Sequence, residues 1–98
     1  MHTYFVYIMT NQYNTVLYTG VTRDLAKRVW QHQHGLGSVF TRKYRVNKLV
    51  YDQPFENISQ AIEREMQVKG GSRIKKGKLV ESLNPDWIDL VRELSLYD

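Results

Sequence analysis

Arg28 and His32 are four residues apart in the segment LAKRVWQH. If this segment is a helix, their side chains are neighbours on one surface and flank the apolar stripe of Leu25 and Val29. Two cationic or proton-bearing groups at the core boundary could bind an anion, and the guanidinium fork matches the geometry of a phosphate. The alternative is structural: the arginine stem lies along the core and the histidine is a satisfied boundary residue.

Glu65 interrupts the apolar pattern of a second predicted helix, residues 58–69. The apolar residues of this helix recur at helical spacing and predict one buried stripe, formed by Ile58, Ala61, Ile62 and Met66. Glu65 falls near the centre of that stripe, and breaks of this kind concentrate at functional sites. A carboxylate there must be paired or must hold a metal, because burying it bare is costly. The alternative to a metal is an internal ion pair with Lys69, one turn further on.

Two tyrosines occur in two neighbouring apolar runs near the start of the chain. Tyr7 lies in FVYIM and Tyr18 in VLYTGV, with turn-forming residues at 11–15 between them. Side chains alternate along a strand, so a hairpin whose turn is centred between residues 12 and 13 would place Tyr7 opposite Tyr18. The alternative is that the tyrosines only stabilise the sheet, since aromatic residues are good strand formers.

The elements that must position these side chains follow from periodicity and turn signals. Strands are predicted at residues 3–9, 16–21 and 47–53, the last ending before Pro54. The first helix should begin after a Thr22 cap, with Asp24 in its first turn, and should end near Gly35. Residues 34–44 are predicted to form a loop that contains glycines and basic residues.

Three more helices are predicted in the second half of the chain. Asn57 resembles the start of a capping box for the helix that ends near Lys69, and a short basic helix follows to residue 83. Asn84 and Pro85 predict a final helix over residues 85–96. The order β-β-α-β-α-α-α implies an α/β domain of the α+β type, with a small three-stranded antiparallel sheet flanked by helices. No repeat, low-complexity tract or linker divides the chain, so residues 1–98 are expected to form one domain.

Composition narrows the class of protein. The 98 residues contain no cysteine, which excludes disulfides and thiolate metal sites. No long apolar run predicts a membrane span and no signal-peptide pattern opens the chain, so a cytoplasmic protein without a membrane role is expected. The net charge is +4, with basic residues concentrated before residue 52 and at 69–78 and acids in the last fifteen residues. This distribution is typical of a surface that faces a polyanion, although solvated charge is the alternative.

The ordered set of these residues resembles the GIY-YIG nuclease superfamily, in particular its small stand-alone members. The sequence FVY at residues 5–7 and YTG at residues 18–20 stand in place of the two family tripeptides. The other matching positions follow in order along residues 3–80: Arg28, His32, Gly37, Thr41, Ala61, Glu65 and Lys69. Each tripeptide alone is weak, but the set with its spacing is specific and implies a GIY-YIG endonuclease-like fold.

The resemblance implies a hydrolytic endonuclease that cuts DNA phosphodiester bonds with one divalent cation, Mg²⁺ or Mn²⁺. Glu65 would be its single protein ligand, and Tyr7 the general base for the attacking water, helped by nearby positive charge. Tyr18 would position the water or the phosphate. Arg28 would stabilise charge on the phosphoryl oxygens, and His32 would orient the same phosphate. Gly20 would leave room for close approach, as a structural residue of the site.

Nucleic acid, in the first place DNA, is the expected partner, with no small-molecule cofactor. The residues expected to contact phosphates are basic and follow the first helix or lie in the second basic cluster: Arg42, Lys43, Arg45, Lys48, Lys69, Arg73, Lys75, Lys76 and Lys78. The sequence is compatible with a monomer and does not distinguish DNA from RNA or duplex from single-stranded or branched substrates.

Two departures from the family pattern leave alternatives to catalysis open. Phe5 replaces the small residue that begins the first tripeptide. Many active members carry an asparagine after the metal-binding helix, whereas Asn84 comes late here and resembles a helix cap. A non-catalytic nucleic-acid-binding module of the same fold is therefore the main alternative to an enzyme. A protein-interaction domain that uses the acidic, amphipathic helix at 85–96 is the third.

Overall fold

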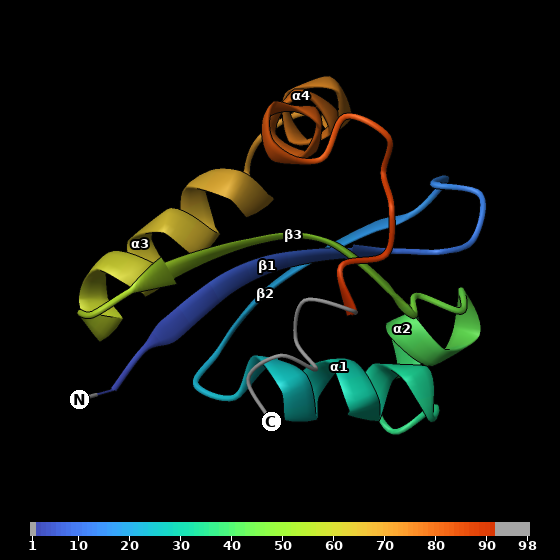
Figure 1. The fold of residues 1–98 in the computed structure, drawn as a ribbon, viewed down its shortest axis with the longest axis horizontal. Coiled ribbons are helices and arrows are strands. Elements are labelled where there is room, and N and C mark those ends of the chain that lie inside the picture. Colours follow the sequence, from blue (N-terminus) through green and yellow to red (C-terminus); the bar gives the residue numbers. More distant parts are fainter. Residues whose placement is uncertain (1, 92–98) are drawn as a thin grey trace.

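A three-stranded antiparallel sheet with strand order β2-β1-β3 forms the centre of the molecule (Figure 1). The computed structural model describes residues 2–91. Its strands are β1 (Tyr4–Thr10), β2 (Leu17–Thr22) and β3 (Lys48–Phe55). Its helices are α1 (Leu25–Gln33), α2 (Val39–Lys43), α3 (Ile58–Lys69) and α4 (Arg73–Leu83). The predicted fold class, a small antiparallel sheet flanked by helices, is confirmed.

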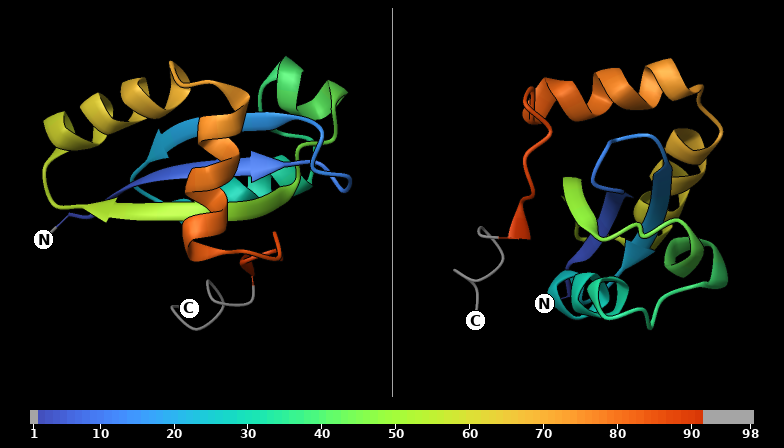
Figure 2. Two further views of the ribbon diagram at one scale, coloured as in Figure 1. Left: turned by 90° about the horizontal axis from the view of Figure 1, so that it is seen from above. Right: turned by 90° about the vertical axis from the view of Figure 1, so that its right-hand side faces the viewer.

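The helices cover the two faces of the sheet. Helices α1 and α2 lie on one side, α3 and α4 on the other, as Figures 1 and 2 show from three directions. Alternate residues of β1 divide accordingly between two hydrophobic clusters. Tyr7 and Met9 pack with Leu25 and Val29 of α1. Ile8 belongs to the other cluster, which is completed by Val50, Tyr51, Val68 and Val80.

The register of the hairpin differs from the assumed one. Tyr7 pairs with Gly20, and Tyr18 pairs with Met9. The turn is centred one residue further along the chain than expected, because the Asn11 side chain organises it by accepting hydrogen bonds from the backbone N–H groups of Thr15 and Val16. Tyr7 and Tyr18 therefore lie diagonally across the two strands, and the prediction that they face each other directly is wrong.

Side-chain caps fix where the helices begin. Asp24, rather than the expected Thr22, caps α1 by accepting a hydrogen bond from the Lys27 N–H. Thr22 instead supports the turn, since its hydroxyl accepts from the N–H of Asp24. Asn57 caps α3 as predicted, through the N–H groups of Ser59 and Gln60.

Two predicted boundaries are wrong, one in the segment before β3 and one at the end of β3. The segment expected to be a loop contains α2, whose Ser38 cap accepts from the Thr41 N–H. Strand β3 does not end before Pro54 but continues to Phe55. It can do so because β3 is an edge strand, where the missing N–H of proline need not leave a gap in the ladder.

The first six residues of the final predicted helix do not adopt helical structure. Residues 85–90 are not helical, and residues 92–96 of the prediction lie outside the described residues. Asn84 ends α4 instead of starting a helix, and its buried amide donates to the carbonyls of Val50 and Ile88. The chain then passes the β3 edge, where the Leu90 N–H donates to the Leu49 carbonyl. The surface proposed for protein interaction is therefore partly used to complete the core.

Across residues 2–91, none of the helices has the length and apolar character needed to span a membrane.

Candidate active site

Tyr7 is the centre of the candidate site. Its side chain is fully buried, and its ring lies on the face of the sheet that α1 covers. The neighbouring strand makes room for it, because a Cβ at Gly20 would lie 2.5 Å from the Tyr7 phenol oxygen. Gly20, which the sequence predicted as a structural residue of the site, is thus required because the Tyr7 side chain lies against it.

Three rings meet around the Tyr7 phenol. The ring centroids of Tyr7 and Tyr18 are 6.3 Å apart, and that of His32 lies 6.2 Å from Tyr7 and 5.5 Å from Tyr18. The Tyr7 phenol oxygen is 3.4 Å from Nε2 of His32. Strands β1 and β2 supply the two tyrosines, and the last turn of α1 supplies the histidine.

His32 is enclosed on its other side by the loop after α1. A Cβ at Gly37 would collide with Nδ1 of His32, so this glycine allows the backbone to close over the imidazole. Within the described residues Nδ1 has no hydrogen-bond partner. The ring is buried, and the hydrogen-bond partner found for it among the described residues is the Tyr7 hydroxyl.

Burial and charge set the protonation of this pair. Burial raises the pKa of Tyr7 to about 12, and Tyr18 adds to the rise, while Arg28 opposes it and Glu65 adds a smaller increase. Burial lowers the pKa of His32 from its ordinary value, and the positive charge of Arg28 lowers it further. At neutral pH the protein therefore holds a protonated phenol beside a neutral imidazole.

Glu65 reaches the site from α3. Ala61 and Val68 are the buried residues of this helix, and Glu65 lies on the same face, four residues after the first and three before the second. The predicted stripe is therefore wrong in part, because Ile58, Ile62 and Met66 are exposed. The prediction that Glu65 occupies the buried face agrees with the structure, where its side chain is 16% exposed.

Glu65 also forms the ion pair expected with Lys69. The Lys69 Nζ lies 3.5 Å from Oε1 of Glu65. The pair is loose, because the lysine side chain is 64% exposed and its ammonium can be replaced by another cation. The charge of Glu65 adds a small increase to the pKa of Tyr7, so the carboxylate is within electrostatic reach of the phenol.

The donor set at Glu65 fits a single hard cation. In the described part of the chain no group of three or more His, Cys, Asp or Glu could hold a metal ion. Mg²⁺ accepts one or two carboxylates and keeps several of its waters, so it does not need such a group. Among the described residues the Glu65 carboxylate is paired with an exposed lysine, and a carboxylate in that state is suited to this kind of ligation.

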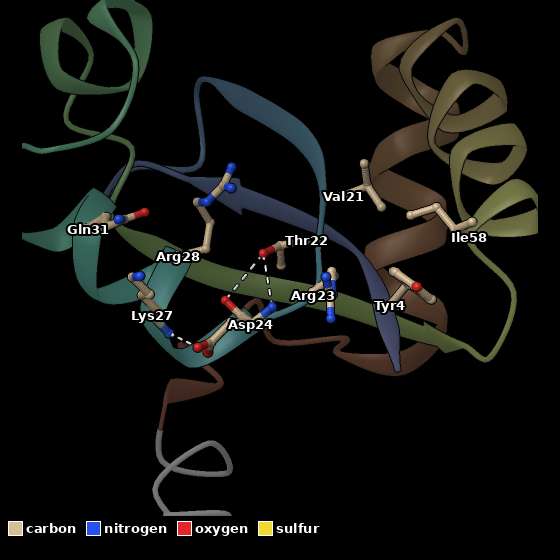
Figure 3. Close-up of a pocket in the computed structure, with 9 residues that line it drawn as sticks. All are labelled: Tyr4, Val21, Thr22, Arg23, Asp24, Lys27, Arg28, Gln31 and Ile58. Carbon is tan, nitrogen blue, oxygen red and sulfur yellow. Dashed lines mark hydrogen bonds between the residues drawn. The ribbon is translucent and has the colours of Figure 1, made fainter. Parts of the chain in front are cut away.

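Arg28 lies between the buried rings and an open cavity. It lines a cavity of about 400 Å³ between α1 and the start of α3, together with Tyr4, Arg23, Lys27 and Ile58 (Figure 3). Among the described residues that line this cavity Asp24 is the single acid, and it accepts the cap hydrogen bond described above. In Figure 3 the Arg28 side chain points from α1 toward the strands. The cavity is thus positively charged beside the site and suited to an anion.

Four of the five predicted catalytic side chains, those of Tyr7, Tyr18, Arg28 and His32, lie around the Tyr7 phenol. The fifth, Glu65 of α3, is linked to them by its small electrostatic effect on Tyr7. Sequence reasoning did not single out Arg23 and Lys27, which line the cavity, or Phe40 of α2, whose ring centroid lies 6.4 Å from that of Tyr18. Lys27 precedes Arg28 in the sequence and could have been found as a basic residue of the first turn. No periodic signal marks Phe40, because α2 has five residues.

The residues predicted to contact phosphates form two separate groups. Arg42, Lys43 and Arg45 belong to α2 and the segment after it, on the side of the sheet that carries α1, and Lys48 is the first residue of β3. The others belong to the end of α3 and to α4, across the sheet (Figure 1). Arg73 hydrogen-bonds the carbonyls of Asn14 and Thr15, so part of its fork is already used within the fold.

Comparisons with known proteins agree with the geometry. The GIY-YIG catalytic domain family model matches residues 3–78. A UPF0213 protein of Staphylococcus saprophyticus is 38% identical over 80 residues, which cover 82% of this chain and 96% of that protein. A UPF0213 protein of Staphylococcus aureus is 37% identical over 81 residues, covering 83% and 98%.

A solved structure is also similar to this one. It is the solution NMR structure of a UPF0213 protein of Bacillus halodurans, with a TM-score of 0.57 and 31% sequence identity. The similarity covers 89% of this chain and 92% of that chain. With the family model matched over most of its length, and with relatives of similar size, this chain belongs to the GIY-YIG catalytic domain family.

Proposed function

We propose that this protein is a divalent-metal-dependent endonuclease that hydrolyses phosphodiester bonds in DNA. The observation that carries the proposal is the convergence of Tyr7, His32, Arg28 and Glu65 beside a positively charged cavity. None of these side chains is adjacent in sequence to another, and a merely structural set would not need a carboxylate and a guanidinium beside a buried phenol. Family membership supports a nuclease.

Arg28 is proposed to hold the scissile phosphate. It borders the cavity on one side and interacts with Tyr7 on the other, so a phosphate seated there lies within reach of both. The guanidinium donates to the phosphoryl oxygens and stabilises the negative charge that grows on them during hydrolysis. Tyr18 contacts the same rings from β2 and orients the attacking water.

Tyr7 and His32 are proposed to act together as the base. A phenol with a pKa near 12 is mostly protonated at neutral pH, so it cannot accept a proton unless it also gives one away. The neutral His32 Nε2 lies 3.4 Å from that hydroxyl and can take its proton while the attacking water gives a proton to the phenol oxygen. In this proposal His32 acts through Tyr7. The sequence alone had suggested a different role, in which His32 contacts and orients the phosphate.

Glu65 is proposed to hold one Mg²⁺ or Mn²⁺ ion. The Glu65 carboxylate would exchange the Lys69 ammonium for the ion. A bound divalent ion supplies Lewis-acid stabilisation of the phosphate and of the leaving oxygen. The residues of this chain do the remaining work by holding the ester, orienting the water and accepting its proton.

Cleavage assays with supercoiled plasmid and branched and single-stranded DNA test this proposal. Wild-type protein should nick at least one substrate with Mg²⁺ or Mn²⁺ and none with a chelator. Glu65→Gln, which keeps the shape but removes the charge, should abolish nicking, whereas Glu63→Gln on the exposed side of the same helix should not. Equal nicking by both variants would refute the metal assignment.

The same assay separates the enzyme from a non-catalytic nucleic-acid-binding module. A module would bind DNA in a salt-dependent manner without cutting it, and Glu65→Gln would leave its affinity unchanged or higher.

A single domain over residues 1–98 and a cytoplasmic location stay predictions from the sequence.

A further inference from the structure

A row of aromatic rings leads from the candidate site to the surface through α2. Tyr18 contacts Phe40 at a centroid distance of 6.4 Å and an interplanar angle of 30°, and Phe40 contacts Tyr44 at 4.9 Å. Phe40 is 43% exposed and Tyr44 is at the end of the same helix, 42% exposed. Two large rings are therefore displayed to solvent beside the catalytic cluster.

Buried Thr41, and not an aromatic ring, is the fully enclosed side chain of α2. Its hydroxyl donates to the Ser38 carbonyl at the start of the same helix. The backbone N–H of buried Val46 donates to the Thr41 carbonyl and closes the segment. Phe40 and Tyr44, four residues apart, share one side of the helix, and both rings are partly exposed there while Phe40 also contacts Tyr18.

The surroundings of the rings are positively charged. Arg42, Lys43 and Arg45 lie on the same short segment, and residues 36–51 contain no aspartate or glutamate. The Lys43 Nζ lies 5.4 Å from the centroid of the Tyr44 ring. A surface that combines exposed aromatic faces with cations is complementary to a polyanion that carries flat rings.

We propose that Phe40 and Tyr44 form a stacking platform for unpaired nucleotides, a surface termed here the α2 platform, so that the substrate is single-stranded next to the bond that is cut. The inference rests on the proposed function in taking nucleic acid as the ligand. Bases of a duplex are covered by their neighbours and cannot stack on a protein ring, whereas unpaired bases can. The cations of the segment then contact the phosphates between those bases.

The position of the platform decides which nucleotides are unpaired. The row begins at Tyr18, whose ring also contacts Tyr7 and His32. Nucleotides stacked on Phe40 are therefore the ones that immediately flank the scissile phosphate. Single strands, flaps and frayed ends fit this surface, and continuous duplex does not.

Binding assays in the presence of a chelator test the platform without any cleavage. Fluorescence anisotropy compares a short single-stranded oligonucleotide with a blunt-ended, loop-free duplex of the same length, at one fixed salt concentration. Wild type should bind the single strand more tightly. Phe40→Ala and Tyr44→Ala should each weaken single-strand binding by about five- to a hundredfold and leave duplex binding almost unchanged.

Three further variants sharpen the result. Phe40→Trp should retain single-strand affinity, and Phe40→Leu, which keeps an apolar side chain and protects the fold, should lose it. Tyr13→Ala removes an exposed aromatic residue from the hairpin turn and should bind like wild type. Equal affinity of wild type for single strand and duplex, full affinity in Phe40→Leu, or no binding to either probe would overturn the platform. Intact single-strand binding without cleavage would overturn the proposed function alone.

Discussion

The phenol of Tyr7 occupies the space that a side chain at Gly20 would need. The two residues pair directly across β1 and β2, and a Cβ at Gly20 would lie 2.5 Å from the phenol oxygen and 2.6 Å from the carbon that carries it. The ring thus extends over the neighbouring strand, and its hydroxyl lies 3.4 Å from Nε2 of His32. The position of the candidate base therefore depends on the absence of a single methyl group.

Gly20→Ala should impair catalysis more than stability. The added methyl group must push the Tyr7 ring away from His32, and overpacking of a core costs about 1–3 kcal/mol of unfolding free energy. Displacement of a catalytic group by about 1 Å can cost about a hundredfold in rate. Urea denaturation and plasmid nicking, measured on the same preparation, separate the two effects.

Gly77→Ala is the matched control for this variant. A Cβ at Gly77 meets its nearest side-chain atoms at 3.7 Å and 3.9 Å, which is ordinary contact, and the residue lies inside α4. Alanine should therefore stabilise the protein by up to about 1 kcal/mol through helix propensity, with nicking unchanged. A Gly20→Ala protein that nicks at the wild-type rate would show that the Tyr7 position is not critical.

The hairpin shows what the sequence could and could not predict. Alternation along the strands correctly predicted which residues share a face, but not the pairing partner of Tyr7. The observed register differs from the assumed one by two residues, and a shift of two keeps every side chain on its face. The face is set by the hydrophobic pattern, whereas the register is set by the Asn11 turn, whose hydrogen bonds no periodicity reveals.

Helix α3 likewise has features that the sequence could predict and features that it could not. Glu65 was found because it breaks a local pattern, and the helix bounds followed from the Asn57 cap and the glycines after Lys69. The exposure of Ile62 and Met66 could not be predicted, since it depends on where the helix sits on the sheet. Such long-range placement is also why α2 was missed: five residues are too few for a periodic signal.

Stability should fall on mild acidification because of His32. The pKa of His32 in the folded protein is lowered, so the unfolded chain binds a proton more readily. Its contribution is therefore complete above the unfolded pKa of about 6.5 and is lost as the pH falls from there toward the folded value. Urea denaturation at a series of pH values between about 5 and 8 should show this slope in wild type, and His32→Gln should flatten it. An identical slope in both proteins would exclude His32 as the source.

Asn84 should be a stability residue and not a catalytic one. Its amide donates to the carbonyls of Val50 and Ile88, and its oxygen accepts from the Ile88 N–H. The Val50 carbonyl lies next to the irregularity in the β1–β3 ladder, where Met9 pairs with Leu49 and Ile8 pairs with Tyr51. Removal of a buried partner of this kind costs about 1–3 kcal/mol per unsatisfied group.

Asn84→Asp tests this role with almost no change in volume. A carboxylate cannot donate to the two carbonyls and repels them, so Asn84→Asp should destabilise the protein by at least as much as Asn84→Ala. Chemical denaturation measures both, and nicking below the melting temperature should persist. If Asn84→Asp were stable and inactive, Asn84 would belong to the catalytic set.

Arg73 should contribute to the fold more than to nucleic-acid binding. Its Nη1 donates to the Thr15 carbonyl at 2.8 Å and its Nη2 to the Asn14 carbonyl at 2.6 Å, which joins the start of α4 to the β1–β2 turn. Asn14 has a positive φ of 57°, so the turn is in a conformation that gains from such support. Arg73→Ala should lower the unfolding free energy by about 1 kcal/mol, because the bonds are exposed to solvent.

Lys75→Ala, two residues further along α4, separates this role from charge. Both variants remove one positive charge from the same helix, so a polyanion-binding role predicts equal losses of DNA affinity and a smaller salt dependence in each. A structural role predicts that only Arg73→Ala unfolds at lower urea concentration. Because the guanidinium is already bound to two carbonyls, Arg73→Ala should lose no more DNA affinity than Lys75→Ala. A larger loss in Arg73→Ala, at unchanged stability, would return this arginine to the nucleic-acid surface.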